Sequence, residues 1–279
     1  MRGPWSRSGT RVRQLTPSDR EAALRILRRQ PVTSILAAVH LGQTTAFDGS
    51  HMLGVEEAGD LTAVCWAGAN TVPVGELAAM DPLAAHLRRR GRRCSSIVGN
   101  SVLVDALWQG LSDSWTRPRE IRAVQPALLI DGPPSPVADP RVRRARPDDF
   151  DALFPAAVAM FTEEVGYDPT RSGSGYAQYV RSLVSSARSW VVTVDGAVVF
   201  KADIGALWEG IAQVQGVWVH PAWRGRGLGT AAMAGVVEQI RADTASAVSL
   251  YVNDYNTSAR RVYEKVGFRP AGTYATILF

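Results

Sequence analysis

One stretch decides the fold of this chain: Gly216-Val-Trp-Val-His-Pro-Ala-Trp-Arg-Gly-Arg-Gly-Leu-Gly-Thr230. Its first residues are mostly apolar and predict the end of a strand, and an amphipathic helix is predicted from about Gly229 onward. The glycines between these elements let the backbone approach a ligand closely. Successive N–H groups at a helix N-terminus bind anions, so the stretch predicts a cradle for a pyrophosphate.

A glycine-rich turn also occurs in other nucleotide-binding folds, but this one lacks the Lys-Ser/Thr pair of a P-loop and comes after three predicted strands instead of one. The next segment separates the two interpretations. It reads Leu250-Tyr-Val-Asn-Asp-Tyr-Asn-Thr-Ser-Ala-Arg-Arg-Val-Tyr-Glu-Lys-Val-Gly-Phe268. A strand ends in Asn253 and Asn256, a helix carries Tyr263, and Gly267 is a favoured helix terminator.

Together the two segments resemble the GNAT superfamily of acyl-CoA-dependent N-acetyltransferases, over roughly Arg141 to Phe279. The family's loop pattern, Arg/Gln-x-x-Gly-x-Gly/Ala, falls on Arg224, Gly227 and Gly229. The resemblance implies that acetyl-CoA is a cosubstrate and that backbone amides of the loop hold its pyrophosphate. The loop residues expected to bind it are Arg224, Gly225, Arg226, Gly227, Leu228, Gly229 and Thr230.

The resemblance also implies roles around the loop. Val217 and Val219 would pair through their backbones with the pantetheine arm, and Asn256 would lie beside that arm. Gly216 is a candidate for the bulge that separates this strand from the next one in the family. An N–H group at the bulge would polarise the thioester carbonyl. Tyr263 matches the family's general acid.

The general base departs from the family's pattern. Many relatives place a glutamate on the strand before the loop, whereas this chain has Gln213 and Gln215, which cannot take a proton. Glu163 and Glu164 lie near the expected acceptor groove, although they also fit as plain surface carboxylates. The expected catalytic residues are therefore Tyr263, Glu164 and Glu163, with Asp203, Glu209 or a water relay as alternatives for the base.

A proline-rich segment and a short repeat suggest two domains. Residues 131–140 hold four prolines and a glycine, which neither a helix nor a central strand tolerates. Residues 141–149 match residues 11–19 at five of nine positions, which suggests duplication of one α/β unit. We expect a loose tail (1–10), a divergent GNAT-like N-terminal domain without a coenzyme A loop (11–130), a linker (131–140) and a GNAT acetyltransferase domain (141–279).

Hydrophobic periodicity and turn signals predict a mixed α/β (α+β) fold. The resemblance implies a mixed, mostly antiparallel sheet flanked by helices in each of two tandem GNAT-like domains. In the second domain we expect strands at 190–194, 197–206, 211–219 and 248–252, helices at 176–187, 229–242 and 257–266, and a final β-segment. In the first domain we expect strands at 52–55, 61–65, 94–98 and 123–130, and a helix that Ser101 caps and that continues through Leu111.

Composition excludes several classes of protein. The chain has 279 residues, 46% of them hydrophobic and 20% charged, so disorder and fibrous repeats are excluded. Its apolar runs are shorter than the ~18 residues of a membrane span, and residues 1–10 lack the apolar core of a secretory signal. We therefore expect a cytoplasmic protein without a membrane partner. Four histidines at unsuitable spacing predict no metal site, and the two cysteines are expected to be buried.

The net charge of +5 is spread over the chain, since residues 1–140 carry 16 arginines and 13 acids, and residues 141–279 carry 15 basic residues and 13 acids. We therefore expect no nucleic-acid partner, although RNA binding through the cluster Arg88, Arg89, Arg90, Arg92 and Arg93 is a further hypothesis.

The leading hypothesis is transfer of an acetyl group from acetyl-CoA to a primary amine of a small molecule or protein. The N-terminal domain would shape the acceptor site or contact a second copy of the chain in a homodimer. The alternative is a non-catalytic module that responds to acyl-CoA, which the missing strand glutamate favours.

Overall fold

The computed structural model describes residues 9–42 and 52–279, so eight residues of the expected tail lie outside the described part of the chain. The chain divides into two packing units. Unit 1 comprises Met1–Ala127 and Ala271–Phe279, and unit 2 comprises Leu128–Pro270. The expected limits of the domains and of the linker stay predictions.

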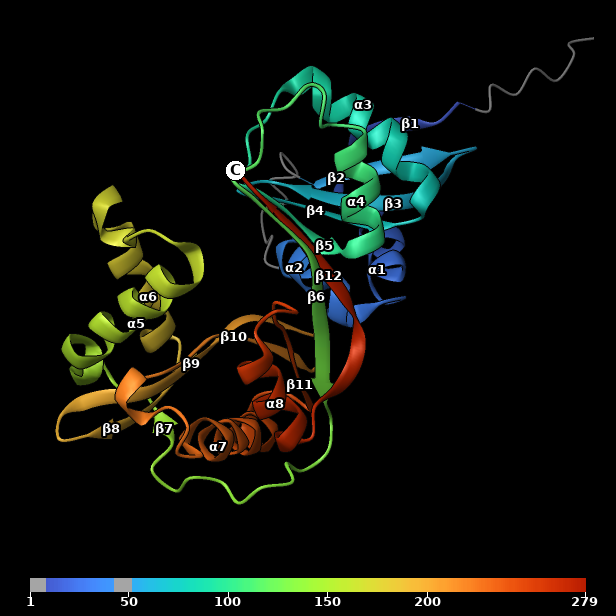
Figure 1. Ribbon diagram of the computed structural model, residues 1–279. Coiled ribbons are helices and arrows are strands. Elements are labelled where there is room, and N and C mark those ends of the chain that lie inside the picture. The colour runs from blue at the N-terminus through green and yellow to red at the C-terminus, as the bar shows by residue number, and fades with distance from the viewer. Residues whose placement is uncertain (1–8, 43–51) are drawn as a thin grey trace, which may run out of the picture. The chain divides into compact units, whose positions relative to one another are not determined.

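Unit 1 is a mixed sheet with helices on both faces. Its strands have the order β1-β2-β3-β4-β5-β12. Neighbouring strands are antiparallel except β4 and β5, which are parallel. Helices α1 and α2 lie on one face and α3 and α4 on the other (Figure 1). The elements are β1 (Arg11–Gln14), α1 (Arg20–Leu27), α2 (Pro31–Gly42), β2 (Met52–Glu57), β3 (Asp60–Ala67), β4 (Asn70–Gly75), α3 (Met80–Arg90), β5 (Ser96–Asn100), α4 (Ser101–Gln109) and β12 (Arg269–Leu278).

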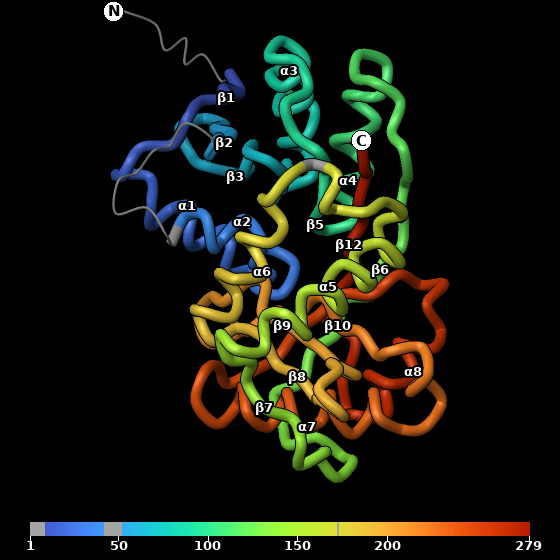
Figure 2. Tube along the Cα trace, turned by 90° about the vertical axis from the view of Figure 1, so that its left-hand side faces the viewer, coloured from blue at the N-terminus to red at the C-terminus, as the bar shows by residue number. Residues whose placement is uncertain are grey.

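Unit 2 has the same layered plan, with the strand order β11-β10-β9-β8-β7 and the end of β6 beside β11. Helix α7 packs on one face of the sheet, and α5 and α6 cover the other face (Figures 1 and 2). The elements are β6 (Glu120–Ile130), whose last three residues belong to unit 2, β7 (Arg143–Arg144), α5 (Phe150–Val165), α6 (Gly175–Ser185), β8 (Ser189–Val194), β9 (Ala197–Trp208), β10 (Ile211–Val219), α7 (Leu228–Asp243), β11 (Ala247–Tyr251) and α8 (Thr257–Val266).

The two halves of the chain repeat one order of elements: a strand, two helices, three strands, a helix, a strand, a helix and a strand. In both halves the sheet is mostly antiparallel and contains one parallel pair, β4–β5 or β10–β11. The expected fold class, with two tandem domains of mixed sheet flanked by helices, is confirmed. The repeat that the sequence showed in nine residues therefore extends over whole halves of the chain.

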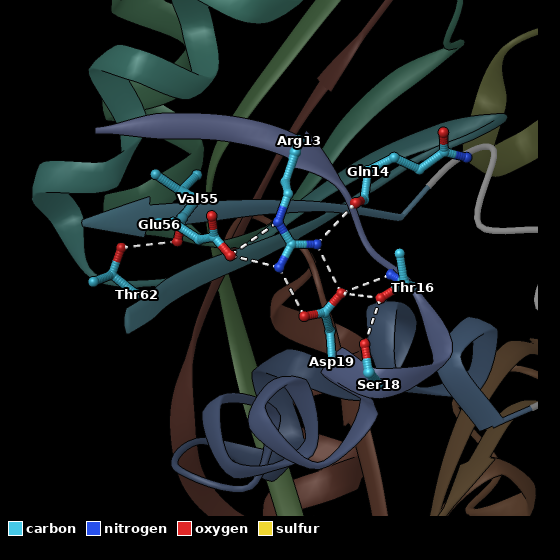
Figure 3. Close-up of polar contacts among 8 residues, drawn as sticks. All are labelled: Arg13, Gln14, Thr16, Ser18, Asp19, Val55, Glu56 and Thr62. Carbon is cyan, nitrogen blue, oxygen red and sulfur yellow. Dashed lines mark hydrogen bonds and ion pairs between the residues drawn. The ribbon is translucent and has the colours of Figure 1, made fainter. Parts of the chain in front are cut away.

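The repeated sequence motif forms the same ionic contact in both halves. Arg13 donates to both carboxylate oxygens of Asp19 at 2.7 Å (Figure 3). Arg143 contacts Asp149 in the same way, at 2.6 and 2.8 Å. The N–H three residues before each aspartate also donates to it, at 2.7 Å. Glu56 adds a second carboxylate to Arg13 in unit 1. Each contact fixes the first strand of its half to the start of the first helix.

Local turn chemistry agrees closely with the sequence. The expected hairpin turn at Asp195 and Gly196 is confirmed, with φ of 49° and 78°, and Gly267 ends α8 with φ of 108°. The expected cap at Ser101 was wrong. Asn100 caps α4, because it keeps a non-helical conformation in which its side chain accepts a hydrogen bond at 3.1 Å, whereas Ser101 is already helical.

Replacing Asp149 by Asn should lower the free energy of unfolding by about 1 to 2 kcal/mol at pH 7, because the change removes a charged, bidentate partner of Arg143. Hydrogen bonds from Arg143 hold the pKa of the Asp149 carboxyl below its ordinary value. Its contribution is therefore complete above the unfolded value of ~3.9 and is lost as the pH falls below it. The measurement is urea unfolding between pH 7 and pH 3.

The matched control is Asp148→Asn, because Asp148 is the exposed neighbour on the same turn. We expect it to change the unfolding free energy by less than ~0.5 kcal/mol. A stability gap between wild type and Asp149→Asn that stays the same from pH 7 to pH 3 contradicts this account.

Candidate functional site

The expected bulge in β10 is confirmed at Gly216. The ladder between β9 and β10 pairs Gln215 with Asp203 and then Trp218 with Lys201, so β10 contains one extra residue at this point. Gly216 has a φ of 59°, in the left-handed region. A Cβ here would lie 3.0 Å from both the Asp203 carboxylate and the Lys201 ammonium. The bulge therefore requires glycine for its backbone conformation and for the space around it.

The ladder between β10 and its parallel neighbour ends before the bulge. Within the described residues, the ladder between β10 and β11 joins residues 211–213 to residues 247–249 and extends no further. On its other side β10 stays paired with β9 up to Val219. Val217 and Val219 therefore lie on a stretch of strand whose edge toward β11 carries no ladder. An extended chain can pair with such an edge through backbone hydrogen bonds.

The glycine-rich loop leads from this edge into α7. Gly225 and Gly227 have φ of 74° and 84°, and Gly227 is the N-cap of the helix. A Cβ at either residue would meet nothing within 4 Å, so their surroundings are open. A Cβ at Gly229 would lie 3.3 Å from Val219. The Arg226 guanidinium lies 5.7 Å from the ring of the tryptophan three residues before it.

Two other loop residues hold the start of α7 in place. Leu228 is buried in the core of unit 2, and the Thr230 N–H donates to Gly227 O at 3.1 Å. The other N–H groups in the first turn of a helix have no partner within that helix, and the helix dipole favours negative charge near them. The loop can therefore bind a phosphate or pyrophosphate.

Arg224 is fixed by contacts on two sides. Its Nε donates to Val219 O at 2.9 Å, and its Nη2 donates to Glu163 Oε2 at 2.7 Å. The other oxygen of Glu163 accepts from Trp218 Nε1 at 3.1 Å. Glu163 therefore ties α5 to the loop and has both oxygens engaged, which favours a positioning role over that of a base.

The other two expected catalytic residues lie within electrostatic reach of each other. Tyr263 is buried in the core of unit 2, where its ring packs edge-on against Phe268 at 5.8 Å. Burial raises the pKa of the Tyr263 phenol well above 10, and the negative charge of Glu164 raises it further. Helix α5 thus holds Glu163 against the loop, and the charge of Glu164 acts on the Tyr263 phenol and also on that of Tyr176.

Asn256 and the two strand glutamines have partners in the protein. Asn256 is the N-cap of α8, and its side chain accepts from the backbone N–H of Ala259 at 3.1 Å. Gln213 is buried, and Gln215 donates to the Tyr179 hydroxyl. Of the alternative bases, Glu209 lies in the turn between β9 and β10, at the other end of β10 from the bulge.

The sequence interpretation missed a buried ion pair. Lys201 Nζ lies 2.5 Å from Asp203 Oδ2 and 2.9 Å from Gly216 O, and the Ser189 hydroxyl donates to the other Asp203 oxygen. Asp203 is thus bound from two sides. Two charges two residues apart in an apolar strand share one face of the sheet, and this pattern could have revealed the pair.

Unit 1 lacks the corresponding loop. Between β4 and α3 the chain has four residues, Glu76–Ala79, and none is a glycine. Glu76 and Asp81 add negative charge where a pyrophosphate would need donors. Tyr263 is the seventh residue of α8, and the seventh residue of α4 is the buried Leu107.

The arginine cluster makes contacts within unit 1. Arg88 donates to Gly110 O at 2.8 Å. Arg92 donates to Cys94 O at 2.7 Å and lies over the ring of Phe279 at 4.9 Å. These contacts fit a structural role for part of the cluster.

Other features of the described chain add no second site. Cys65 and Cys94 are buried free thiols, as expected, and burial raises the pKa of Cys65 above its ordinary value. Among the described residues, no three histidine, cysteine or acidic side chains gather where a metal ion could be held. No helix in residues 9–42 or 52–279 has the length and apolar character needed to cross a membrane.

Comparison with known families gives a match for most of the second half of the chain. The model of the acetyltransferase (GNAT) family matches residues 151–268. This part of the chain belongs to the GNAT family. Residues 50–153 match a family described as a domain of unknown function, DUF4081. The GNAT domain includes the bulge, the glycine-rich loop and Tyr263.

A curated relative covers a short segment. Sixty residues are 43% identical to mycothiol acetyltransferase from Streptosporangium roseum, and this segment is 22% of the present chain and 18% of that enzyme. The chain therefore spans less than a fifth of the length of the curated relative that it matches.

Solved structures share the fold over nearly the whole chain. The GCN5-related N-acetyltransferase from Sphaerobacter thermophilus is 16% identical with a TM-score of 0.60, over 96% of this chain and 94% of that one. A tandem GNAT protein from the clavulanic acid biosynthesis pathway is 14% identical with a TM-score of 0.54, over 97% and 98% of the two chains. At these identities the likeness concerns the fold alone.

Gly216→Ala should lower the unfolding free energy by about 1 to 3 kcal/mol, since a left-handed non-glycine residue is strained and the added Cβ would press on the Lys201–Asp203 pair. Gly175→Ala is the matched control, because Gly175 starts α6 and a Cβ there would meet nothing within 4 Å. Urea unfolding measures both. Equal stability of the two variants would contradict the assignment of strain to the bulge.

Proposed function

We propose that unit 2 transfers an acetyl group from acetyl-CoA to the primary amine of a small molecule or protein. The observation that carries this proposal is the order of two backbone features: the open edge of β10 is followed, after the short 3-10 turn Pro221–Trp223, by the loop Arg224–Thr230. These features offer hydrogen bonds to an extended arm and, after it, N–H groups to a diphosphate. The geometry supports a ligand that has both parts in this order.

The cofactor-binding residues take distinct roles in this proposal. Backbone amides of Arg224–Thr230 hold the pyrophosphate, and the Arg224 and Arg226 side chains balance its charge. Val217 and Val219 pair with the pantetheine arm, and Asn256 lies beside that arm while it caps α8. Unit 1 binds no coenzyme A, because its short acidic turn offers no comparable cradle.

The amine must lose a proton before it attacks. A lysine-like amine with a pKa of ~10.4 is neutral in only about one molecule in a few thousand at pH 7. A base or a desolvating pocket must therefore raise the fraction of neutral amine roughly a thousandfold. We assign the base to Glu164 over Glu163, because both oxygens of Glu163 are engaged by Trp218 and Arg224.

Tyr263 would return a proton to the leaving thiolate. From an ordinary phenol to a thiol of pKa ~8.5 this transfer is uphill by about 2 kcal/mol, and burial raises the pKa of Tyr263 further. Burial also destabilises a thiolate released beside the phenol, which raises the thiol pKa in the same direction. Because the phenol and the thiolate share one buried environment, part of the free-energy cost of the proton transfer is offset.

A second candidate is a non-catalytic module that binds acyl-CoA. It is favoured by glutamines at both strand positions, 213 and 215, and by the raised pKa of Tyr263. It keeps the loop and the open edge and assigns no proton transfer to the phenol. Acetyl transfer by the wild-type protein separates the two candidates.

Gly227→Glu should reduce acetyl-CoA affinity at least about a hundredfold, because it places a carboxylate at the anion cradle and strains the N-cap. Gly196→Glu is the matched control, since Gly196 has a similar φ of 78° in a hairpin turn and equally open surroundings. Isothermal titration with acetyl-CoA measures both. Unchanged affinity in Gly227→Glu would refute the loop assignment.

Tyr263→Phe should keep acetyl-CoA affinity within about twofold and slow acetyl transfer about 100-fold, because it removes only the proton donor. The assay incubates each protein with isotopically labelled acetyl-CoA and a cell extract, and mass spectrometry identifies the acetylated amine. Transfer at the wild-type rate by Tyr263→Phe excludes the phenol as the acid. Acetyl-CoA binding without any transfer by the wild-type protein favours the non-catalytic module.

A further inference from the structure

We propose that Lys201 is a positioning residue, held by Asp203, that aims the backbone N–H of Val217 at the acetyl carbonyl and strengthens it as a donor. This inference rests on the proposed function, because it names a device within the same site. Neither charged residue touches the reacting atoms in this account. Both act through the peptide bond between Gly216 and Val217.

The pair is buried as deeply as the core around it. The side chain of Lys201 is 1% exposed and that of Asp203 is 6% exposed. Taking two charges out of water costs several kcal/mol each, and an apolar pair of similar volume is often as stable. Stability alone is therefore a weak reason for charged residues at these two positions, which leaves room for a role in the site.

The contact from Lys201 fixes the direction of one peptide plane. Its ammonium donates to Gly216 O at 2.9 Å. No cis peptide bond occurs in the described chain, so the C=O of Gly216 and the N–H of Val217 point to opposite sides of a planar trans unit. The Val217 N–H therefore points away from Lys201. Gly216 and Val217 are also skipped by the β9 ladder, which passes from Gln215 to Trp218.

The same contact changes the strength of that donor. A cation at the carbonyl oxygen polarises the amide, and polarised groups in a hydrogen-bonded chain donate more strongly. Asp203 holds the ammonium in place and balances its charge, and Ser189 in turn holds Asp203. The chain of contacts thus runs from Ser189 through the ion pair to one backbone N–H at the bulge.

A purely structural role makes a different prediction. If the pair only supports the sheet, its loss affects coenzyme A and acetyl-CoA equally, because both ligands share the diphosphate and the pantetheine arm. If the pair aims the Val217 N–H, its loss affects the acetyl carbonyl selectively. Comparing the two ligands therefore needs no knowledge of the amine acceptor.

The test uses the full chain with coenzyme A and with acetyl-CoA carrying carbon-13 at the carbonyl. Isothermal titration gives the two affinities, and infrared difference spectra give the carbonyl stretch. In the wild type we expect a lower stretching frequency than in free acetyl-CoA. In Lys201→Met we expect the frequency to move back toward the free value. In the same variant, acetyl-CoA affinity should fall about threefold to tenfold, which corresponds to the loss of one hydrogen bond. Coenzyme A affinity should stay within about twofold of the wild-type value.

Lys265→Met is the matched control, because Lys265 is the other lysine of the chain and is exposed near the end of α8. We expect Lys265→Met to show the wild-type carbonyl frequency and the wild-type affinities for both ligands. If Lys201→Met does not fold, the double variant Lys201→Met/Asp203→Leu, which replaces the pair by apolar side chains, is expected to give the same selective loss.

The outcomes separate the inference from the proposed function. If the wild type binds neither ligand, the proposed function fails first. If the wild type binds acetyl-CoA and the variants keep its carbonyl frequency and affinity, the positioning role is refuted and the function stands. An equal loss of both ligands in a folded variant also refutes it, because that is the structural outcome.

Discussion

The left-handed backbone at Gly216 is the constraint on which the candidate site depends. One extra residue in β10 interrupts the pairing with β9 at residues 216 and 217, and the ladder with β11 ends at residue 213, three residues before the bulge. The open edge of β10 leads through the short turn Pro221–Trp223 to the loop at Arg224–Thr230. A side chain at position 216 would meet both charges of the buried pair. The bulge, the open edge and the ion pair are therefore parts of one arrangement.

The chain uses one scaffold twice, with a different connection before the third helix of each copy. The Arg13–Asp19 and Arg143–Asp149 contacts hold equivalent elements, and both halves contain one parallel pair of strands. The two copies differ in the segment that joins the fourth strand of each half to its third helix. Unit 2 has a glycine-rich loop there, whereas unit 1 has four residues without glycine. The two copies therefore share one order of elements and differ in this connecting segment.

Features set by local chemistry could be predicted from the sequence. The bulge at Gly216, the Asp195–Gly196 turn and the end of α8 at Gly267 each need a backbone conformation that few residues adopt. Features set by packing between distant segments were harder to predict from the sequence. The strand expected from Cys94 begins at Ser96, and the Lys201–Asp203 pair needs three strands and the bulge to come together. The engagement of Glu163 by Arg224 joins residues 61 positions apart, which no local pattern reveals.

A crystal structure of the wild-type chain grown with acetyl-CoA tests the central claim most directly. The account predicts the diphosphate on the main-chain amides of Arg224–Thr230, the thioester carbonyl within hydrogen-bond distance of the Val217 N–H, and the Tyr263 hydroxyl directed toward the sulfur. A structure with that loop empty, with the coenzyme bound in unit 1, or with the phenol turned away from the sulfur would contradict it.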